Sequence, residues 1–243
     1  MNKQFKLELT GSTLKWIAIV TMLIDHIGAI VLEKMVIASG WDESLYLGYM
    51  VLRLIGRFAF PIFCFLLVEG FLYTRNRKKY AQRLFLFALI SEVPFDLACD
   101  ERVWDLSRQN VFFTLFFGFV GMMVLETIEQ KEQWNRYLRM VFCMAAAGAV
   151  MGFAHLLHTD YAAFGVLTIL VMYLFRFQKT ISFAAGCLVL TVMDSYLEPI
   201  TFLGVILIFL YNGKKGSGNK WFFYVFYPAH LLILWGLSKV LMQ

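Results

Sequence analysis

Charged residues are scarce in this sequence. Only 16% of its 243 residues are Asp, Glu, Lys or Arg, whereas 60% are apolar and 25 are phenylalanine. Soluble globular domains carry roughly 25% charged and at most about 50% apolar residues. The scarcity of charge therefore nearly excludes a soluble fold, and the long apolar runs predict segments that span a lipid bilayer.

Proline is also rare, with four residues, and no run alternates polar with apolar residues. A bilayer admits only helices and closed β-barrels, because each backbone N–H and C=O must be bonded internally. A barrel requires the alternation that is missing here. We therefore predict an all-α, polytopic integral membrane bundle, which forms one domain over residues 1–243 and resides in the plasma or inner membrane of the cell.

Paired cysteines and several catalytic motifs are absent as well. The four cysteines stand singly in apolar segments, without the CxxC spacing of a metal or redox site. No GxSxG, Walker-type, GxGD or dinucleotide-binding motif occurs. These absences argue against a hydrolase, a nucleotide-driven pump, an intramembrane aspartyl protease and a bound metal. The lack of an internal repeat weakens a secondary-transporter interpretation.

Hydropathy over windows of about 20 residues predicts nine spans. The stretches near 161–176 and 198–211 are short, so tilted, re-entrant or fused segments stay open. The nine spans are 14–32, 49–72, 81–98, 110–127, 138–157, 161–176, 180–196, 198–211 and 221–241.

The basic residues predict the orientation of these spans. Loops on the side of the N-terminus collect most of the Lys and Arg residues, whereas the opposite loops are mainly acidic. The positive-inside rule then places the N-terminus inside and the C-terminus outside. The net charge of +5 is thus explained first by topology and contact with anionic lipid, and we expect no nucleic-acid partner.

Ionisable residues within a bilayer are costly, so each is a candidate for function. Asp25 and His26 lie in the first span, and a histidine can accept and return a proton near neutral pH. Adjacent residues of a helix point about 100° apart, so Asp25 is expected to orient a second-span arginine rather than His26. His230 lies near the middle of the last span, after Pro228, and is a second candidate for catalysis.

Arg53 and Arg57 stand at i and i+4 before Pro61, which places both guanidiniums on one helix face. They could hold an anion or stabilise an oxyanion. The alternative is that Arg57 only neutralises Asp25 while Arg53 extends to the outer surface.

Three further polar residues near the outer side could bind an acceptor amine or hydroxyl. Glu92 and Asp96 share a helix face, and Asn110 opens the fourth span. The carboxylates could equally form a solvated helix end. Glu69 is interpreted as a salt-bridge partner of the basic residues that follow it. The string His155, His158 and Asp160 lacks the framework of a zinc site, so we expect no metal there.

Four segments resemble the TraX family over nearly the whole chain. They are Lys15–Trp16–Ile17–Ala18 continuing to Met22–Leu23–Ile24–Asp25–His26–Ile27–Gly28, the segment from Arg53 to Pro61, Glu69–Gly70–Phe71 with Tyr80–Ala81–Gln82–Arg83–Leu84, and Phe223–Tyr224–Val225–Phe226–Tyr227–Pro228–Ala229–His230. The namesake of that family is associated with N-terminal acetylation of conjugative pilin. The family is also similar to wider groups of transmembrane acyltransferases.

The resemblance implies an acyltransferase that takes an acetyl group from cytosolic acetyl-CoA. The acceptor would be an amine or hydroxyl of a peptide, such as a pilin N-terminus, or of a surface glycan on the outer side. His26 would be the base, with Asp25, Arg57 and His230 as the other catalytic residues. The expected ligands of coenzyme A are basic, namely Arg53, Arg75, Arg77, Lys78, Lys79, Arg83, Lys214 and Lys215.

Two other interpretations stay open. The buried charges could form the proton relay of a small-molecule or lipid-linked-sugar exporter. The protein could also be a non-catalytic assembly protein for surface structures.

Overall fold

The computed structural model describes residues 8–218 and 220–242, most of which are helical. Five helical stretches are long and apolar enough to cross a membrane, and three shorter apolar helices accompany them. A further long helix, Arg77–Cys99, is more polar. Together these make nine helical units in the described residues, one for each predicted span. The prediction of a multi-pass helical membrane protein is confirmed.

The elements follow one another without a named strand in the described residues. They are α1 Gly11–His26, η1 Ile27–Leu32, α2 Glu33–Ala38, α3 Glu43–Gly56, α4 Ala59–Tyr73, α5 Arg77–Cys99, α6 Val111–Glu129, α7 Arg136–Leu156, α8 Ala162–Leu174, α9 Lys179–Met193, η2 Glu198–Leu203, α10 Gly204–Phe209 and α11 Lys220–Leu241.

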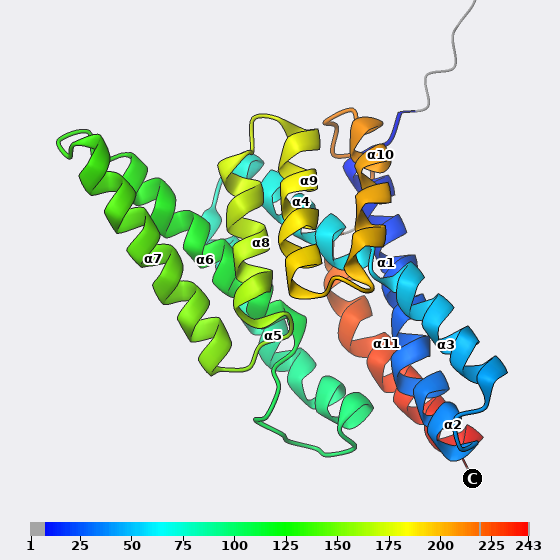
Figure 1. Ribbon diagram of the computed structural model, residues 1–243. Helices are drawn as coiled ribbons and strands as arrows, with labels where there is room; N and C mark the ends of the chain where they lie inside the picture. Colours follow the sequence, from blue (N-terminus) through cyan, green and yellow to red (C-terminus); the bar gives the residue numbers. More distant parts are fainter. Residues whose placement is uncertain (1–7, 219, 243) are drawn as a thin grey trace, which may run out of the picture.

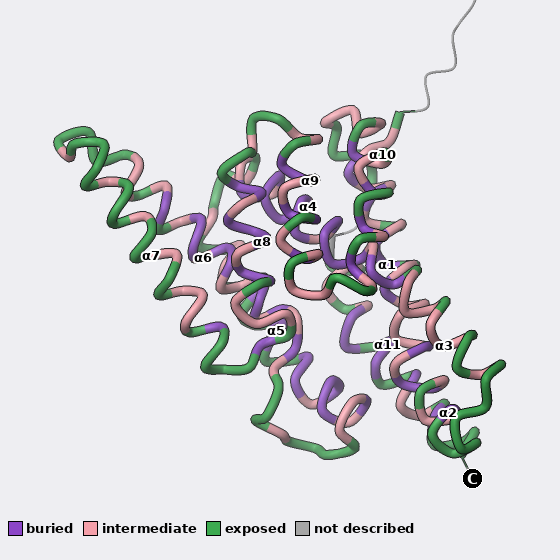
Figure 2. Tube along the Cα trace, viewed as in Figure 1, coloured by how far each residue is buried: buried purple, intermediate pink, exposed green. Residues whose placement is uncertain are grey.

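α4 forms the centre of the bundle. It packs against α1, α6, α8 and α9, and its large side chains Phe65 and Phe71 are fully enclosed. Figures 1 and 2 show this buried helix behind α8 and α9, while the α6–α7 hairpin extends outward, with α6 partly buried and α7 largely exposed. The exposed surface of α7 is apolar, as expected for a helix that faces lipid.

The start of α1 and the loops after α4, α6, α8 and α10 lie at one end of the bundle (Figure 1). We call this the basic end, because it carries Arg75, Arg77, Lys78, Lys79, Lys131, Arg136, Arg176, Lys179, Lys214 and Lys215. The positive-inside rule assigns it to the cytosol. That orientation stays a prediction.

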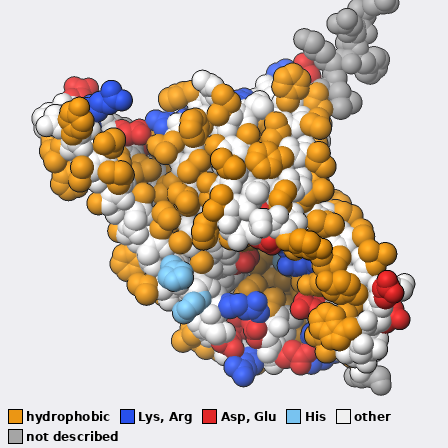
Figure 3. Space-filling model, in the orientation of Figure 1, with side chains coloured by type: hydrophobic (Ala, Val, Ile, Leu, Met, Phe, Trp, Pro, Cys, Tyr) orange, Lys and Arg blue, Asp and Glu red, His pale blue; other side chains and the backbone are white. Residues whose placement is uncertain are grey.

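α8 and α9 are short, with 13 and 15 residues. Thirteen residues of α-helix rise about 20 Å, whereas the hydrocarbon core is about 30 Å thick. The turns at 157–161 and 194–197 therefore lie partway along the bundle, where irregular backbone is tolerated if it is covered or lines a cavity. Figure 3 shows the molecule hollowed beneath these short helices, with acidic and basic side chains around the hollow.

The second span differs from the prediction of one segment over 49–72. The structure has two helices, α3 and α4, separated at Arg57 and Phe58. Pro61 explains the break, because it has no N–H to donate to the carbonyl of Arg57 and its ring clashes with that carbonyl. The first span also differs, since it continues to Ala38 and becomes π-helical directly after His26. π-helical turns are rare and frequently occur at functional sites.

Candidate active site

Two histidines from the two ends of the chain meet inside the bundle. Nδ1 of His26, the last residue of α1, lies 2.6 Å from Nε2 of His230 on α11. His230 is only 4% exposed, whereas His26 is half-buried. The rings of Tyr227 and Phe226 pack beside the pair. The two histidines that sequence reasoning singled out separately therefore form one unit.

A backbone carbonyl sets the direction of this hydrogen-bond chain. Nδ1 of His230 lies 2.8 Å from the carbonyl oxygen of Phe226, which can only accept, so Nδ1 must carry the proton. In neutral His230 the other nitrogen, Nε2, then accepts, and His26 must donate from Nδ1. This leaves Nε2 of His26 with a free lone pair.

A four-residue ion-pair network lies beside the histidines. Arg53 contacts Asp25 at 2.6 Å, and Arg57 contacts the other carboxylate oxygen of Asp25 at 3.1 Å. Arg57 also reaches Glu198 of η2 at 3.3 Å. Two guanidiniums thus face two carboxylates, so the buried charges compensate one another. The prediction that Asp25 pairs with a second-span arginine is confirmed.

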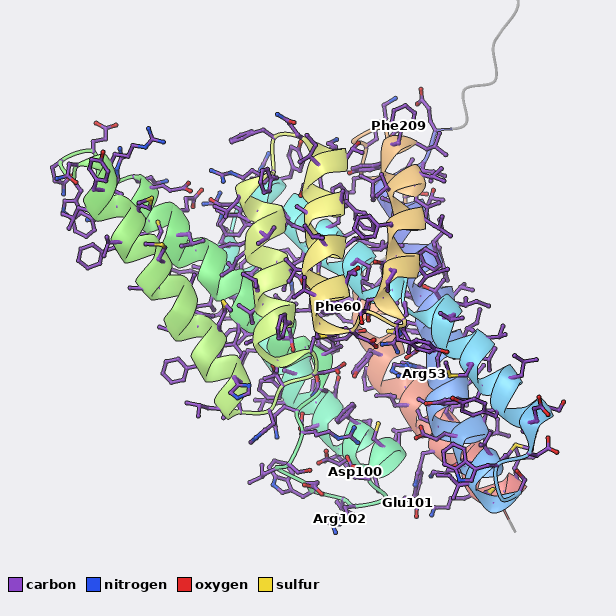
Figure 4. All side chains as sticks on the ribbon, in the orientation of Figure 1. Arg53, Phe60, Asp100, Glu101, Arg102 and Phe209 are labelled. Carbon is purple, nitrogen blue, oxygen red and sulfur yellow. The ribbon has the colours of Figure 1, made fainter. Side chains whose placement is uncertain are left out.

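Arg53 does not extend to the outer surface, so that alternative was wrong. It was also predicted to be a ligand of coenzyme A, but the structure places it in this network rather than with the other basic residues. Figure 4 shows Arg53 between Phe209 at the basic end and Glu101 at the opposite end. Arg53 donates one guanidinium N–H to Asp25, so in the described part of the chain its other donors are free to bind a further group.

Gly56 allows α1 and α3 to approach at this point. A Cβ atom at Gly56 would lie 2.2 Å from the side chain of Asp25. Because that distance is far below van der Waals contact, any larger residue would displace the carboxylate that holds both arginines.

The predicted acceptor residues are buried between α5 and α6. Glu92 and Asp96 are 3% and 0% exposed, so the alternative that these carboxylates form a solvated helix end was wrong. Asn110 caps α6 by accepting from the N–H of Phe112, and its amide donates to the carbonyl of Ala88 at 2.8 Å and to Glu92. Asp96 accepts from the backbone N–H of Asp105. One oxygen of each carboxylate has no partner in the described part of the chain.

The predicted coenzyme A residues divide into several environments at the basic end. Arg77 is paired with Glu126 and stacks on Phe71, so its charge is already compensated. Arg83 contacts the ring of Tyr80 and the hydroxyl of Tyr224. Within the described residues, no carboxylate pairs with Arg83 or with the remaining members, Arg75, Lys78, Lys79, Lys214 and Lys215.

The sequence also singled out Glu69 and the histidine string that begins at His155. Glu69 accepts from the hydroxyl of Tyr211 at 3.0 Å and lies 3.9 Å from Lys179, so its partners are not the basic residues directly after it. His155 is exposed in the last turn of α7, and His158 is exposed in the turn that leads to α8. Among the described residues, no group of three His, Cys, Asp or Glu could hold a metal ion.

Sequence reasoning did not single out Glu198, which stands at the start of the predicted span 198–211. The structure buries this residue completely, against Arg57. A signal was present, because Glu198 stands between two apolar segments too short to span a membrane separately. A carboxylate at such a junction must find a partner at membrane depth.

The fold and the buried site define a multi-pass helical membrane protein with a polar centre of paired histidines and ion pairs. Residues 10–238 match the family described as TraX protein, so the chain belongs to the TraX family. It is 31% identical over 254 aligned residues to the probable fimbrial assembly protein FimC, serogroup H1, of Dichelobacter nodosus. That similarity covers 94% of this chain and 95% of the relative. No solved structure matches the chain.

Proposed function

We propose that this protein is a membrane acetyltransferase that modifies a pilin or other fimbrial component. It transfers an acetyl group from cytosolic acetyl-CoA to an amine or hydroxyl of a peptide or glycan acceptor on the outer side. Membership of the TraX family and similarity to a fimbrial assembly protein support the role in pilus or fimbria formation. The acetyl group and its donor are what the resemblance to the TraX family implies, and the site supports the general-base chemistry that such a transfer needs.

The observation that carries the proposal is the hydrogen-bond chain from Phe226 through His230 to His26. A general base needs an unprotonated nitrogen in a fixed orientation. The chain holds the proton of His26 on Nδ1, which leaves Nε2 as the base. His230 therefore positions His26 and shares the positive charge that forms when Nε2 takes a proton.

The reaction then requires two proton transfers by one group. Nε2 of His26 removes a proton from the acceptor while the acceptor N or O attacks the carbonyl carbon of the acetyl thioester. The C–S bond breaks, and the departing thiolate receives the proton from His26. The free N–H groups of Arg53 stabilise the oxyanion, while Asp25 and Arg57 hold Arg53 in place. Transfer through an acetylated His26 is a variant of the same chemistry.

The basic end provides cations for the phosphates of coenzyme A. Lys79 and Arg83 stand one turn apart on α5, so they share a helix face. The carbonyls of Lys214 and Lys215 accept from the first N–H groups of α1, those of Gly11 and Ser12. From there to His26 the helix rises about 21 Å. The donor must therefore present its acetyl group on a long arm, as coenzyme A does.

Binding and slow hydrolysis of acetyl-CoA by the purified protein in detergent would test both parts of the proposal. We expect His26→Ala to retain binding but to lower turnover by about 10²- to 10⁴-fold. Replacing Lys214 and Lys215 together with Gln should weaken binding, because two phosphate contacts are lost. His158→Ala is the matched control for His26, since this histidine is exposed and lies outside the site.

Two outcomes would overturn the proposal. If no saturable binding is found at any accessible concentration of acetyl-CoA, then acetyl-CoA is excluded as the donor. Proton-driven uptake into liposomes that is lost in Asp25→Asn and indifferent to acetyl-CoA would instead assign the buried charges to an exporter.

A further inference from the structure

A groove of about 650 Å³ lies between α5 and α6 on the surface of the bundle. It is not used by the proposed acetyl transfer. Its lining is apolar apart from one cation and two neutral polar side chains, and it consists of Lys78, Ala81, Gln82, Phe85, Phe116, Val120, Met123, Val124, Thr127 and Ile128.

The groove faces the region that lipid occupies. Phe85 and Val124 in its walls are 43% and 37% exposed, and the apolar residues Leu86 and Leu89 next along α5 are also exposed. In a helix that crosses the bilayer, such residues contact lipid chains. The occupant of the groove must therefore be apolar along most of its length.

The length of the groove corresponds to one leaflet. From Ile128 to Phe116, α6 rises about 18 Å, whereas half of the hydrocarbon core is about 15 Å thick. An acyl chain that starts at the membrane surface would thus fill the groove without reaching the other leaflet. A spanning helix of a partner protein would be twice as long.

The charge at the end of the groove identifies the headgroup. Lys78 lies at the basic end, and within the described residues no carboxylate pairs with it. The acidic residues nearby are already engaged, since Glu126 pairs with Arg77 and Glu129 pairs with Arg176. A free ammonium above an apolar groove is complementary to a phosphate that carries an acyl chain.

We propose that the groove between α5 and α6 binds an anionic phospholipid of the leaflet at the basic end. One acyl chain lies along Phe85, Val120 and Val124, and the phosphate contacts Lys78. The resemblance assigned Lys78 to coenzyme A, and this proposal assigns it to lipid instead. Lys79 and Arg83 are on a different face of α5 from Lys78 and Gln82, so the lipid site is separate from the pair proposed to bind coenzyme A.

The test compares two lipids that have the same acyl chains, phosphatidylglycerol and phosphatidylcholine, added to delipidated protein in neutral detergent. We expect the anionic lipid to raise the melting temperature by about 5 °C or more at concentrations where the zwitterionic lipid has little effect. Lys78→Gln should abolish this difference. Lys79→Gln also removes one positive charge, but Lys79 lies outside the groove lining. This variant should therefore retain the difference between the two lipids.

Native mass spectrometry provides a second measurement that does not depend on melting. The wild-type protein should retain one more bound phosphatidylglycerol than Lys78→Gln, and Val120→Trp, which fills the groove, should lose the same molecule. Equal shifts from the two lipids, or a lipid preference unchanged in Lys78→Gln, would overturn the proposal. Acetyl-CoA binding should be unchanged in Val120→Trp, because Val120 lines the groove and belongs to neither the catalytic nor the coenzyme A residues. Failure of the lipid site and failure of the proposed function are therefore distinguishable.

Discussion

The imidazole of His26 donates from Nδ1 to Nε2 of His230 at 2.6 Å, across a separation of 204 residues in the sequence. The contact joins the first helical unit of the bundle to the last. It gives His26 a fixed ring orientation and a defined tautomer. The site can therefore be tested at His230 as well as at the proposed base.

We expect His230→Ala to lower acetyl transfer by about 10- to 100-fold, comparable to the loss of other hydrogen-bond partners that orient a functional histidine. Nδ1 of His26 loses its acceptor in this variant, so the base is no longer held in one tautomer. His230→Gln should recover part of the activity, because its side-chain carbonyl can accept the same hydrogen bond. Turnover against pH in both variants is the measurement. Equal loss in both would indicate that His230 has only a packing role.

The ion pair between Arg57 and Glu198 should be costly to break from one side. Arg57→Gln leaves Glu198 buried without its cation, and such losses amount to about 3–5 kcal/mol. Removing both charges in Arg57→Met with Glu198→Leu should restore most of that stability, although not the activity. Unfolding in a series of detergent mixtures measures the coupling between the two positions. A double variant as unstable as the sum of the single ones would contradict a direct pairing.

Gly56 should tolerate no side chain. In Gly56→Ala the new Cβ atom meets Asp25 at 2.2 Å, so α1 and α3 must separate and the contacts to both arginines lengthen. We expect a loss of about 1–3 kcal/mol together with reduced activity. Gly148→Ala is the control, because a Cβ there meets nothing within 4 Å and alanine favours the helix. Melting temperatures of the two variants should move in opposite directions.

Asp160, in the turn between α7 and α8, should make stability depend on pH. Desolvation raises the pKa of its carboxyl to about 6, while Arg57 partly opposes the rise and Asp25 adds to it. More than a third of the residue is exposed, so solvent screening keeps the effect on stability small. The pKa is about 3.9 in an unfolded chain, so the fold is penalised above pH 6 and the penalty disappears as the pH falls towards 4. We expect Asp160→Asn to raise the melting temperature at pH 7.5 and to have little effect near pH 4.

Asp105 should affect stability in the opposite direction from Asp160. The backbone N–H of Ser107 lowers the pKa of its carboxyl, so ionised Asp105 favours the fold at neutral pH. Asp105→Asn should lower the melting temperature at pH 7.5, and its effect should shrink only in more acidic solution. If both variants shift the melting temperature at pH 7.5 in the same direction, the raised pKa of Asp160 is contradicted.

The sequence by itself determined the class of fold, the nine helical units and the family. Apolar runs of membrane length, the scarcity of charge and the uneven Lys and Arg loops are local properties, so they can be read without knowledge of packing. The pairing of Asp25 with an arginine was also predictable, because a charge at membrane depth must be compensated and two arginines occupied the next span.

Only the tertiary structure decided which of these residues meet. The contact of His26 with His230 depends on how α11 packs against α1. That of Arg57 with Glu198 depends on where η2, packed against α9, places its carboxylate, and no local pattern encodes either arrangement. The break between α3 and α4 at Arg57 likewise depends on Pro61 together with the carboxylates of Asp25 and Glu198, which pair with Arg57. Helix formation in a membrane follows from the chain itself, whereas the composition of the polar centre follows from long-range packing of helices whose apolar surfaces are nearly alike.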